Sequence, residues 1–290
     1  SKVLVPSWYI LQAYLFFSLS GPSLLSYVVI SCTSSYKRSL YYILSVWIKS
    51  DFFYDVTISS SIVHSANSTI DISTGSSLIY SGGEINVGAK TLNFSGGGSF
   101  SNDENVVMDD PEGILKFDGI STLSNVSVPV VLTTGKVDVD QDTVVQNFSH
   151  SGTSRLDILS GKTLTITNGF EVPQEKTMEF IGSDGTLALS DNLTLSGTLK
   201  FSASGELSNG IVAMNGGKLD VDESITISSN LVHLADSIID ILSEKSLIYT
   251  GDEFEIEDLL LTFNGEGTFS NTENINLNDS ASSNKLNGIS

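Results

Sequence analysis

Two pairs of acidic residues have the type and spacing that could do chemistry. Asp138 and Asp140 flank a single valine, as do Asp220 and Asp222 farther along the chain. In a β-strand such residues share one face, and their carboxylates lie about 7 Å apart at two residues' rise. Calcium takes six to eight oxygen ligands, and such a pair could supply some of them. Acid–base hydrolysis by two carboxylates also needs about this separation.

The same four residues also have a structural interpretation. A row of exposed acids gives a solvated face that resists edge-to-edge aggregation. The recurrence of the pair favours this interpretation, because an enzyme needs its catalytic constellation only once. The sequence therefore predicts no catalytic residue and no cofactor, and it leaves Asp138, Asp140, Asp220 and Asp222 as candidate calcium ligands.

The three histidines could suggest a metal cluster. His64, His150 and His233 each stand seven residues before the Asp of an Asp-Ile pair, and they follow one another at nearly equal intervals. Each interval corresponds to four coils of about 21 residues each. At the spacing of stacked strands four coils span about 19 Å, so no two histidines can share one ion. We expect each histidine to occupy the same packing or turn position in its repeat.

A long internal repeat must position these residues. Residues 58–121 and 227–290 are two copies of one segment, and 30 of the 64 aligned positions are identical. A fixed period is typical of an array, in which each unit leaves an apolar face that its neighbours cover. We interpret 58–226 as one full unit and 227–290 as the start of the next, which predicts a longer protein.

Residues 55–290 show the pattern of short strands. Runs such as 164–166, 193–195 and 225–227 alternate apolar with polar residues and are bounded by Gly, Asn, Asp and Ser. Leu231–Leu242 comes nearest to a helical pattern, but its counterpart Ile62–Ser73 is rich in Ser, Thr and Asn, which disfavour helix.

A Phe-containing motif gives the length of one coil. The motif begins at Phe94 and again at Phe117, and it begins at Phe180 and again at Phe201. Each of these steps is about one coil long. The predicted fold is all-β: a single-stranded parallel β-helix, or β-solenoid, of about 21 residues per coil, with eight coils in each full unit.

Residues 1–54 form a hydrophobic N-terminal segment of different composition. No charged residue lies between Lys2 and Lys37, and no acid precedes Asp51. Val3–Ser35 is long and apolar enough to span a bilayer, which predicts a membrane anchor or an export segment. A truncated or mis-framed reading and a packed domain are the other interpretations. Any attachment to a membrane would therefore be through residues 1–54.

The charge of the remaining chain excludes some partners. Residues 51–290 carry all 34 acids against ten basic residues, a net charge of −24. Nucleic acid and anionic membrane would be repelled by this region. Two other β-helix functions are left as alternatives. The first is a polysaccharide lyase or hydrolase. A lyase needs basic groups to abstract a proton and to neutralise a uronate carboxylate, yet the basic residues are scattered singly. An ice-binding solenoid needs Thr-x-Thr in every coil, and residues 163–167 are one such run.

The phrases KTLNFSGGGSFSN, GTLALSDNLTLSGTLKFSASGELSN and GKLDVDESITISSN resemble the β-solenoid repeats of large bacterial surface adhesins. Filamentous-haemagglutinin-like proteins and autotransporter passengers are similar in texture and period over residues 55–290. The resemblance implies a right-handed parallel β-helix, export to the cell surface, and adhesion.

The expected function is that of a structural and adhesive rod, not an enzyme, that binds by repeated weak contacts. Its expected partner is a host or neighbouring cell surface, through a glycan or a matrix protein. Its expected location is extracellular or at the cell surface, and outer membrane-associated if the source is bacterial.

Overall fold

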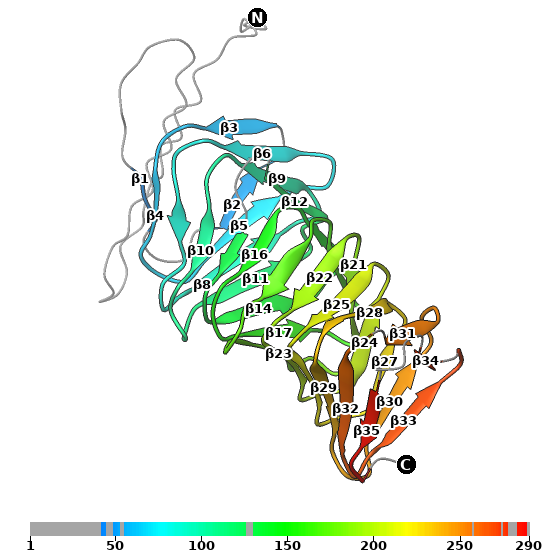
Figure 1. Cartoon of the computed structure of the whole chain (residues 1–290). Coiled ribbons are helices and arrows are strands. Elements are labelled where there is room, and N and C mark those ends of the chain that lie inside the picture. Colours follow the sequence, from blue (N-terminus) through cyan, green and yellow to red (C-terminus); the bar gives the residue numbers. More distant parts are fainter. Residues whose placement is uncertain are drawn as a thin grey trace, which may run out of the picture.

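The computed structural model describes residues 42–44, 49–52, 55–125, 130–256, 258–273, 275–277 and 283–288. These residues form 35 strands, and every pair of neighbouring strands is parallel (Figure 1). The strands stack along one axis, from β3 at one end to β35 at the other. The predicted all-β parallel β-solenoid is confirmed, with about 22 residues per coil, close to the expected length.

Each coil contributes one strand to each of three faces. The first sheet has twelve strands in the following order: β2 (Lys49–Phe52), β5 (Ser68–Ile72), β8 (Thr91–Ser95), β11 (Ile114–Asp118), β14 (Lys136–Val139), β17 (Ser154–Ile158), β20 (Thr177–Phe180), β23 (Thr198–Phe201), β26 (Lys218–Val221), β29 (Ser237–Ile241), β32 (Leu260–Gly265) and β35 (Ser283–Leu286). The second sheet has eleven strands: β3 (Val56–Ile58), β6 (Ser77–Tyr80), β9 (Ser99–Asn102), β12 (Thr122–Asn125), β15 (Thr143–Val145), β18 (Thr163–Ile166), β21 (Gly185–Leu189), β24 (Gly205–Ser208), β27 (Ile225–Ile227), β30 (Ser246–Tyr249) and β33 (Thr268–Asn271).

The third face is divided into four blocks of paired strands. The blocks are β1 (Tyr42–Leu44) with β4 (Ile62–His64); β7 (Ile85–Asn86), β10 (Val106–Met108), β13 (Val130–Leu132) and β16 (Phe148–His150); β19 (Phe170–Val172), β22 (Asn192–Leu195), β25 (Ile211–Asn215) and β28 (Asn230–Ala235); and β31 (Phe254–Ile256) with β34 (Ile275–Leu277). The first and second sheets run without interruption past the boundaries of these blocks.

The core follows from the alternation of side chains along each strand. In β8 and β11, for example, every second side chain is buried. Phe94 of β8 lies in register with Phe117 of β11, and their ring centroids are 6.4 Å apart. Phe180 and Phe201 repeat the arrangement at 5.4 Å. Because identical positions face inward in successive coils, each coil covers the apolar face of the next.

The repeat intervals found in the sequence correspond to whole numbers of coils in the structure. Asp71 in β5 and Asp240 in β29 belong to the same sheet and lie eight strands apart. The three histidines lie on the third face in β4, β16 and β28, and four coils separate neighbouring copies, as predicted. Coil length varies, because the chain from Asp138 to its register partner Asp157 is shorter than the chain from Asp240 to its partner Asn264.

Two further predictions can be compared with the structure. Leu231–Leu242 is not a helix, since β28 and β29 cover almost all of it. Within the predicted hydrophobic segment 1–54, β1 and β2 pair with β4 and β5. The apolar run Val3–Ser35 lies outside the described residues, and none of the described residues belongs to a helix long and apolar enough to cross a membrane.

Candidate functional site

The four candidate calcium ligands lie on or directly after strands of the first sheet, and each has a lysine beside it. Asp138 accepts from the Lys136 ammonium at 3.2 Å, and Asp220 accepts from Lys218 at 3.0 Å. Asp140 pairs with Lys116 of the preceding coil, and Asp222 pairs with Lys200 at 2.7 Å. All four carboxylates are therefore already held by a cation of the protein itself.

Two of these lysines each bridge two coils. The Lys136 ammonium also lies 2.8 Å from Asp157, and the Lys218 ammonium lies 2.7 Å from Asp240. Asp138 and Asp157 are direct register partners, as are Asp220 and Asp240. Like charges directly opposite each other destabilise a sheet. One lysine between each stacked pair of aspartates offsets that repulsion.

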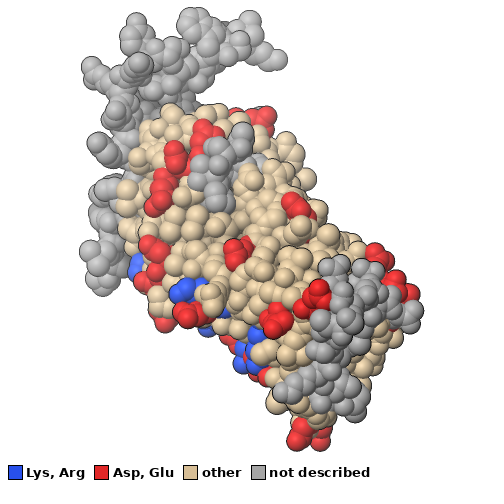
Figure 2. Space-filling view, viewed as in Figure 1, with Lys and Arg blue, Asp and Glu red and all other residues tan. Residues whose placement is uncertain are grey.

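The ion pairs favour the charged form of all four lysines, and the pKa of each lysine is raised. The hydrogen bond to Asp140 raises the pKa of Lys116, and the hydrogen bond to Asp222 raises the pKa of Lys200. Lys136 and Lys218 also have raised pKa values, although partial burial opposes the effect of their aspartate partners. Figure 2 shows basic and acidic side chains gathered together along one edge of the molecule, over β14, β17 and β23.

The structure thus places the two Asp-x-Asp pairs in equivalent positions four coils apart, on β14 and β26. Among the described residues, no group of three or more His, Cys, Asp or Glu side chains is placed to hold a metal ion. The signal that sequence reasoning overlooked is the lysine two residues before each pair, in KVDVD and KLDVD. In a strand, such a lysine shares the face of the aspartates.

The histidines occupy inward positions of the third face. His150 and His233 are more than nine-tenths buried. His64 is partly exposed, and its ring nitrogens lie 3.0 and 3.2 Å from the carbonyl oxygens of Val87 and Thr91. The three histidines therefore share one position of the third face, as expected, but His64 is less buried than the other two and has carbonyl partners that they lack among the described residues.

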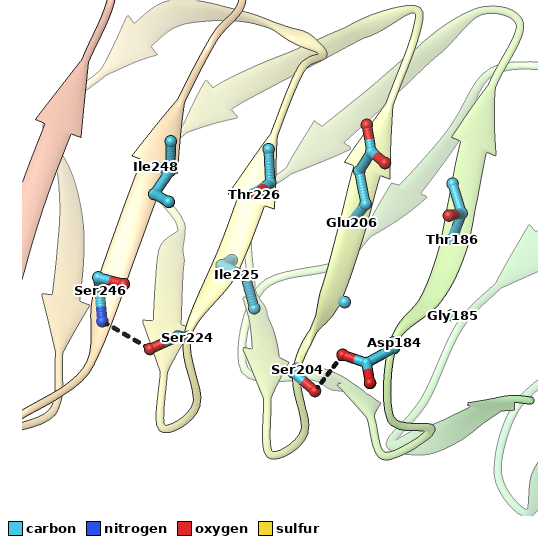
Figure 3. Close-up of a pocket in the computed structure, with 11 residues that line it drawn as sticks. Asp184, Gly185, Thr186, Ser204, Glu206, Ser224, Ile225, Thr226, Ser246 and Ile248 are labelled. Atoms are coloured by element: carbon cyan, nitrogen blue, oxygen red, sulfur yellow. Dashed lines mark hydrogen bonds between the residues drawn. The ribbon is translucent and has the colours of Figure 1, made fainter. Parts of the chain in front are cut away.

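A shallow groove of about 280 Å³ crosses four coils of the second sheet (Figure 3). Thr186, Glu206, Thr226 and Ile248 are successive register partners along its length. Serine residues line one side, where the Ser204 hydroxyl donates to Asp184 at 2.8 Å. The groove therefore offers mainly hydroxyl groups, and a carboxylate and an isoleucine interrupt its threonine column.

Exposed apolar side chains recur at equivalent positions of the two repeat copies. Val63 and Val232, which match each other on the third face, are 49% and 38% exposed. Ile79 and Ile248, which match each other on the second sheet, are both 42% exposed. Neither pair helps to form the core. Sequence reasoning missed these positions, because burial cannot be assigned until the face of each strand is known.

Both carboxylate pairs of the described structure are occupied by lysines, and the two Lys–Asp clusters stand four coils apart on the same sheet. Two pairs of exposed apolar side chains also recur along the stack, Val63 with Val232 and Ile79 with Ile248. Comparison of the chain with family models, with curated proteins and with solved structures gives no match.

Proposed function

We propose that this chain is a structural and adhesive segment of a long cell-surface or secreted repeat protein, a rod that binds its partner by repeated weak contacts. The recurrence of exposed isoleucine at Ile79 and Ile248 carries the proposal. An exposed large apolar side chain adds nothing to the core, yet it stands at the same position in both copies. Eight coils separate the two, which is about 38 Å along the stack.

Equivalent surfaces at a fixed distance favour multivalent binding. A partner that engages one unit finds the same groups on the next, and linked weak contacts raise overall affinity by about 10²–10⁴-fold. The chain's net charge of −20 opposes approach to acidic surfaces. The partner proposed here is therefore an uncharged patch of a host or neighbouring cell surface, on a glycan or a matrix protein.

An adhesion assay with matched variants tests the proposal. Beads coated with the full chain are passed over cells, over neutral glycans and over matrix protein, and retention is measured under flow. Ile79→Ser and Ile248→Ser each lower retention, because one of two linked contacts is lost. The double variant lowers retention further than either single change, by about 10-fold or more.

Leu234→Ser is the control, because Leu234 is 54% exposed but its counterpart in the first copy is Ser65. This change leaves retention unaltered. Equal retention of the double variant and the unmodified chain would overturn the proposal. So would the release of new reducing ends from a polysaccharide by the chain, which would instead favour a carbohydrate-active enzyme.

A further inference from the structure

A histidine marks every interruption of the third face. Among the described strands, pairing stops between β4 and β7, between β16 and β19, and between β28 and β31. His64 ends β4, His150 ends β16 and His233 lies in β28, so each belongs to the last strand before an interruption. The chain has three histidines, and all three have this position. We call each interruption, with its histidine, a joint.

Besides its histidine, every joint has the same kind of hydrogen bond. In a parallel ladder, a backbone N–H donates to a carbonyl oxygen of the next strand. At the joints, the N–H two residues before the histidine donates instead to a side-chain oxygen from the stretch that leads into the next coil. The three contacts are Ile62 N–H to Tyr80 Oη at 2.9 Å, Phe148 N–H to Asn168 Oδ1 at 2.6 Å, and Leu231 N–H to Tyr249 Oη at 3.2 Å.

The histidines of two joints replace apolar core residues. His150 is the register partner of Leu132, and His233 is the register partner of Met214. Neither ring has a partner at hydrogen-bonding geometry among the described residues, although the backbone of Glu171 lies near His150 and that of Ala235 near His233. A neutral imidazole tolerates such a site at some cost, whereas a buried imidazolium without a partner is strongly disfavoured.

Few ionisable groups surround these two rings. On the strands that flank His150, β13 and β19, the ionisable residue is Glu171, which accepts from the Ser196 hydroxyl at 2.7 Å. Around His233, the following turn carries Asp236, whose carboxylate is the charged group that acts on the ring. Beside His150 the joint opens into a crevice of about 420 Å³, which Glu171 also lines. Water therefore has a short path to the ring once the joint loosens.

We propose that the joints at β16/β19 and β28/β31 are acid-sensitive hinges, at which protonation of His150 or His233 opens the third face while the other two sheets stay paired. The continuous pairing of β17 with β20 and of β18 with β21 supports this geometry at the first hinge. With two sheets intact and one face open, the solenoid bends at the joint instead of unfolding.

The direction of the pH dependence follows from burial. Desolvation lowers the pKa of His150 to about 4, an effect that the nearby Glu171 backbone only partly offsets. It also lowers the pKa of His233, with the Asp236 carboxylate opposing. An opened joint exposes the imidazole, whose pKa is then near 6.5. Opening is therefore favoured as the pH falls below about 6.5, down to about 4 at the His150 hinge, by up to about tenfold per pH unit for one proton.

The joint at β4/β7 has a different environment. The ring nitrogens of His64 face two carbonyl oxygens, so a protonated ring could donate to both. Partial burial is the main cause that lowers the pKa of His64, and the nearby Lys90 ammonium lowers it further. The two carbonyl acceptors make opening of this joint less steeply pH-dependent than opening of the other two. The β4/β7 joint is therefore the internal reference for the other two joints.

Hydrogen exchange on the full chain tests the hinges. Amide protection factors are measured from pH 7 to pH 4.5, with intrinsic exchange corrected at each pH. For the unmodified chain, the Phe148 and Leu231 amides, which donate across the two joints, lose protection as the pH falls, by up to about tenfold per unit. Amides of β17, β20 and β23 in the first sheet keep theirs.

Two substitutions taken from the chain's own register are the matched variants. His150→Leu introduces the residue type of its register partner Leu132, and His233→Met introduces that of its register partner Met214. Each substitution abolishes the pH dependence of amide protection at its own joint and leaves that of the other joint unchanged. His64→Leu leaves both unaltered.

Two results would overturn the proposal that these joints are acid-sensitive hinges. In the first, the Phe148 amide of His150→Leu loses protection in parallel with that of the unmodified chain. In the second, protection falls equally in all three sheets, which is global acid unfolding. An NMR titration of the imidazole protons gives an independent check, because a His150 that titrates near 6.5 in the folded chain contradicts the closed state described here.

Discussion

Tyr80 and Tyr249 show how one side chain joins two faces of the solenoid. Both rings are fully buried, and they stand at equivalent positions of the two repeat copies. The Tyr249 hydroxyl accepts from the Leu231 N–H at 3.2 Å and donates to the Asp252 carbonyl at 2.7 Å. Burial raises the pKa of both tyrosines, which keeps the hydroxyls protonated and able to donate.

Removal of either hydroxyl leaves a backbone N–H without its acceptor. We expect Tyr80→Phe and Tyr249→Phe each to lower the free energy of unfolding by about 1–2 kcal/mol. Because the two sites lie eight coils apart, the double variant should lose the sum of the two within about 0.5 kcal/mol. Denaturant unfolding of the three variants measures this. Single variants as stable as the unmodified chain would contradict the role assigned to the hydroxyls.

At the scale of the element, the turns between strands decide how closely successive coils approach. Gly152 follows β16, and a Cβ added there would overlap the Thr133 carbonyl oxygen of the coil before it. Gly161 lies in an open turn with φ of +69°, and an added Cβ would meet nothing within 4 Å. The first glycine is required by close packing of backbones and the second by backbone conformation.

These two glycines form a matched pair for substitution. Gly161→Ala should lower stability by about 1 kcal/mol, the usual cost of a left-handed conformation for a residue with a Cβ. Gly152→Ala should lower it by more than about 3 kcal/mol, because two backbones must separate and the coil spacing cannot change locally. Thermal unfolding followed by circular dichroism compares the two. Equal costs would mean that the coils are not in contact at Gly152.

At the scale of the whole molecule, residues 51–290 carry a net charge of −24, and only some of their acids are paired with lysines. The paired lysines remove the most severe repulsions, those between aspartates stacked in register. The remaining acids repel one another over longer distances, and salt screens such repulsion.

Added salt should therefore stabilise the rod. We expect the midpoint of thermal unfolding to rise by about 2–4 °C between about 0.01 and 0.15 M NaCl, equivalent to about 1 kcal/mol. Calcium chloride at matched ionic strength should add nothing further, because Asp138, Asp140, Asp220 and Asp222 already have ammonium partners. A calcium-specific rise that Asp138→Asn removes would instead identify these residues as calcium ligands.

Much of the fold could be predicted from the sequence. Alternation in runs such as 164–166 fixes which side chains share a face, because strands have a period of two. The match of Ile62–Ser73 with Leu231–Leu242 indicated strand where one copy alone suggested helix. The candidate site was predicted less completely. The Asp-x-Asp pairs were found, but their lysines and the exposure of Ile79 and Ile248 were not.

The sequence by itself determined that short strands with one apolar side recur along the chain in steps of about one coil, and stacking of such coils buries those sides. Only the tertiary structure decided which residues of neighbouring coils meet. Coil length varies along the stack, so the pairing of Lys136 with Asp157 cannot be counted along the chain. The same holds for the joints, because a break in pairing exists only between coils, where side-chain oxygens from one coil replace the carbonyl partners of another.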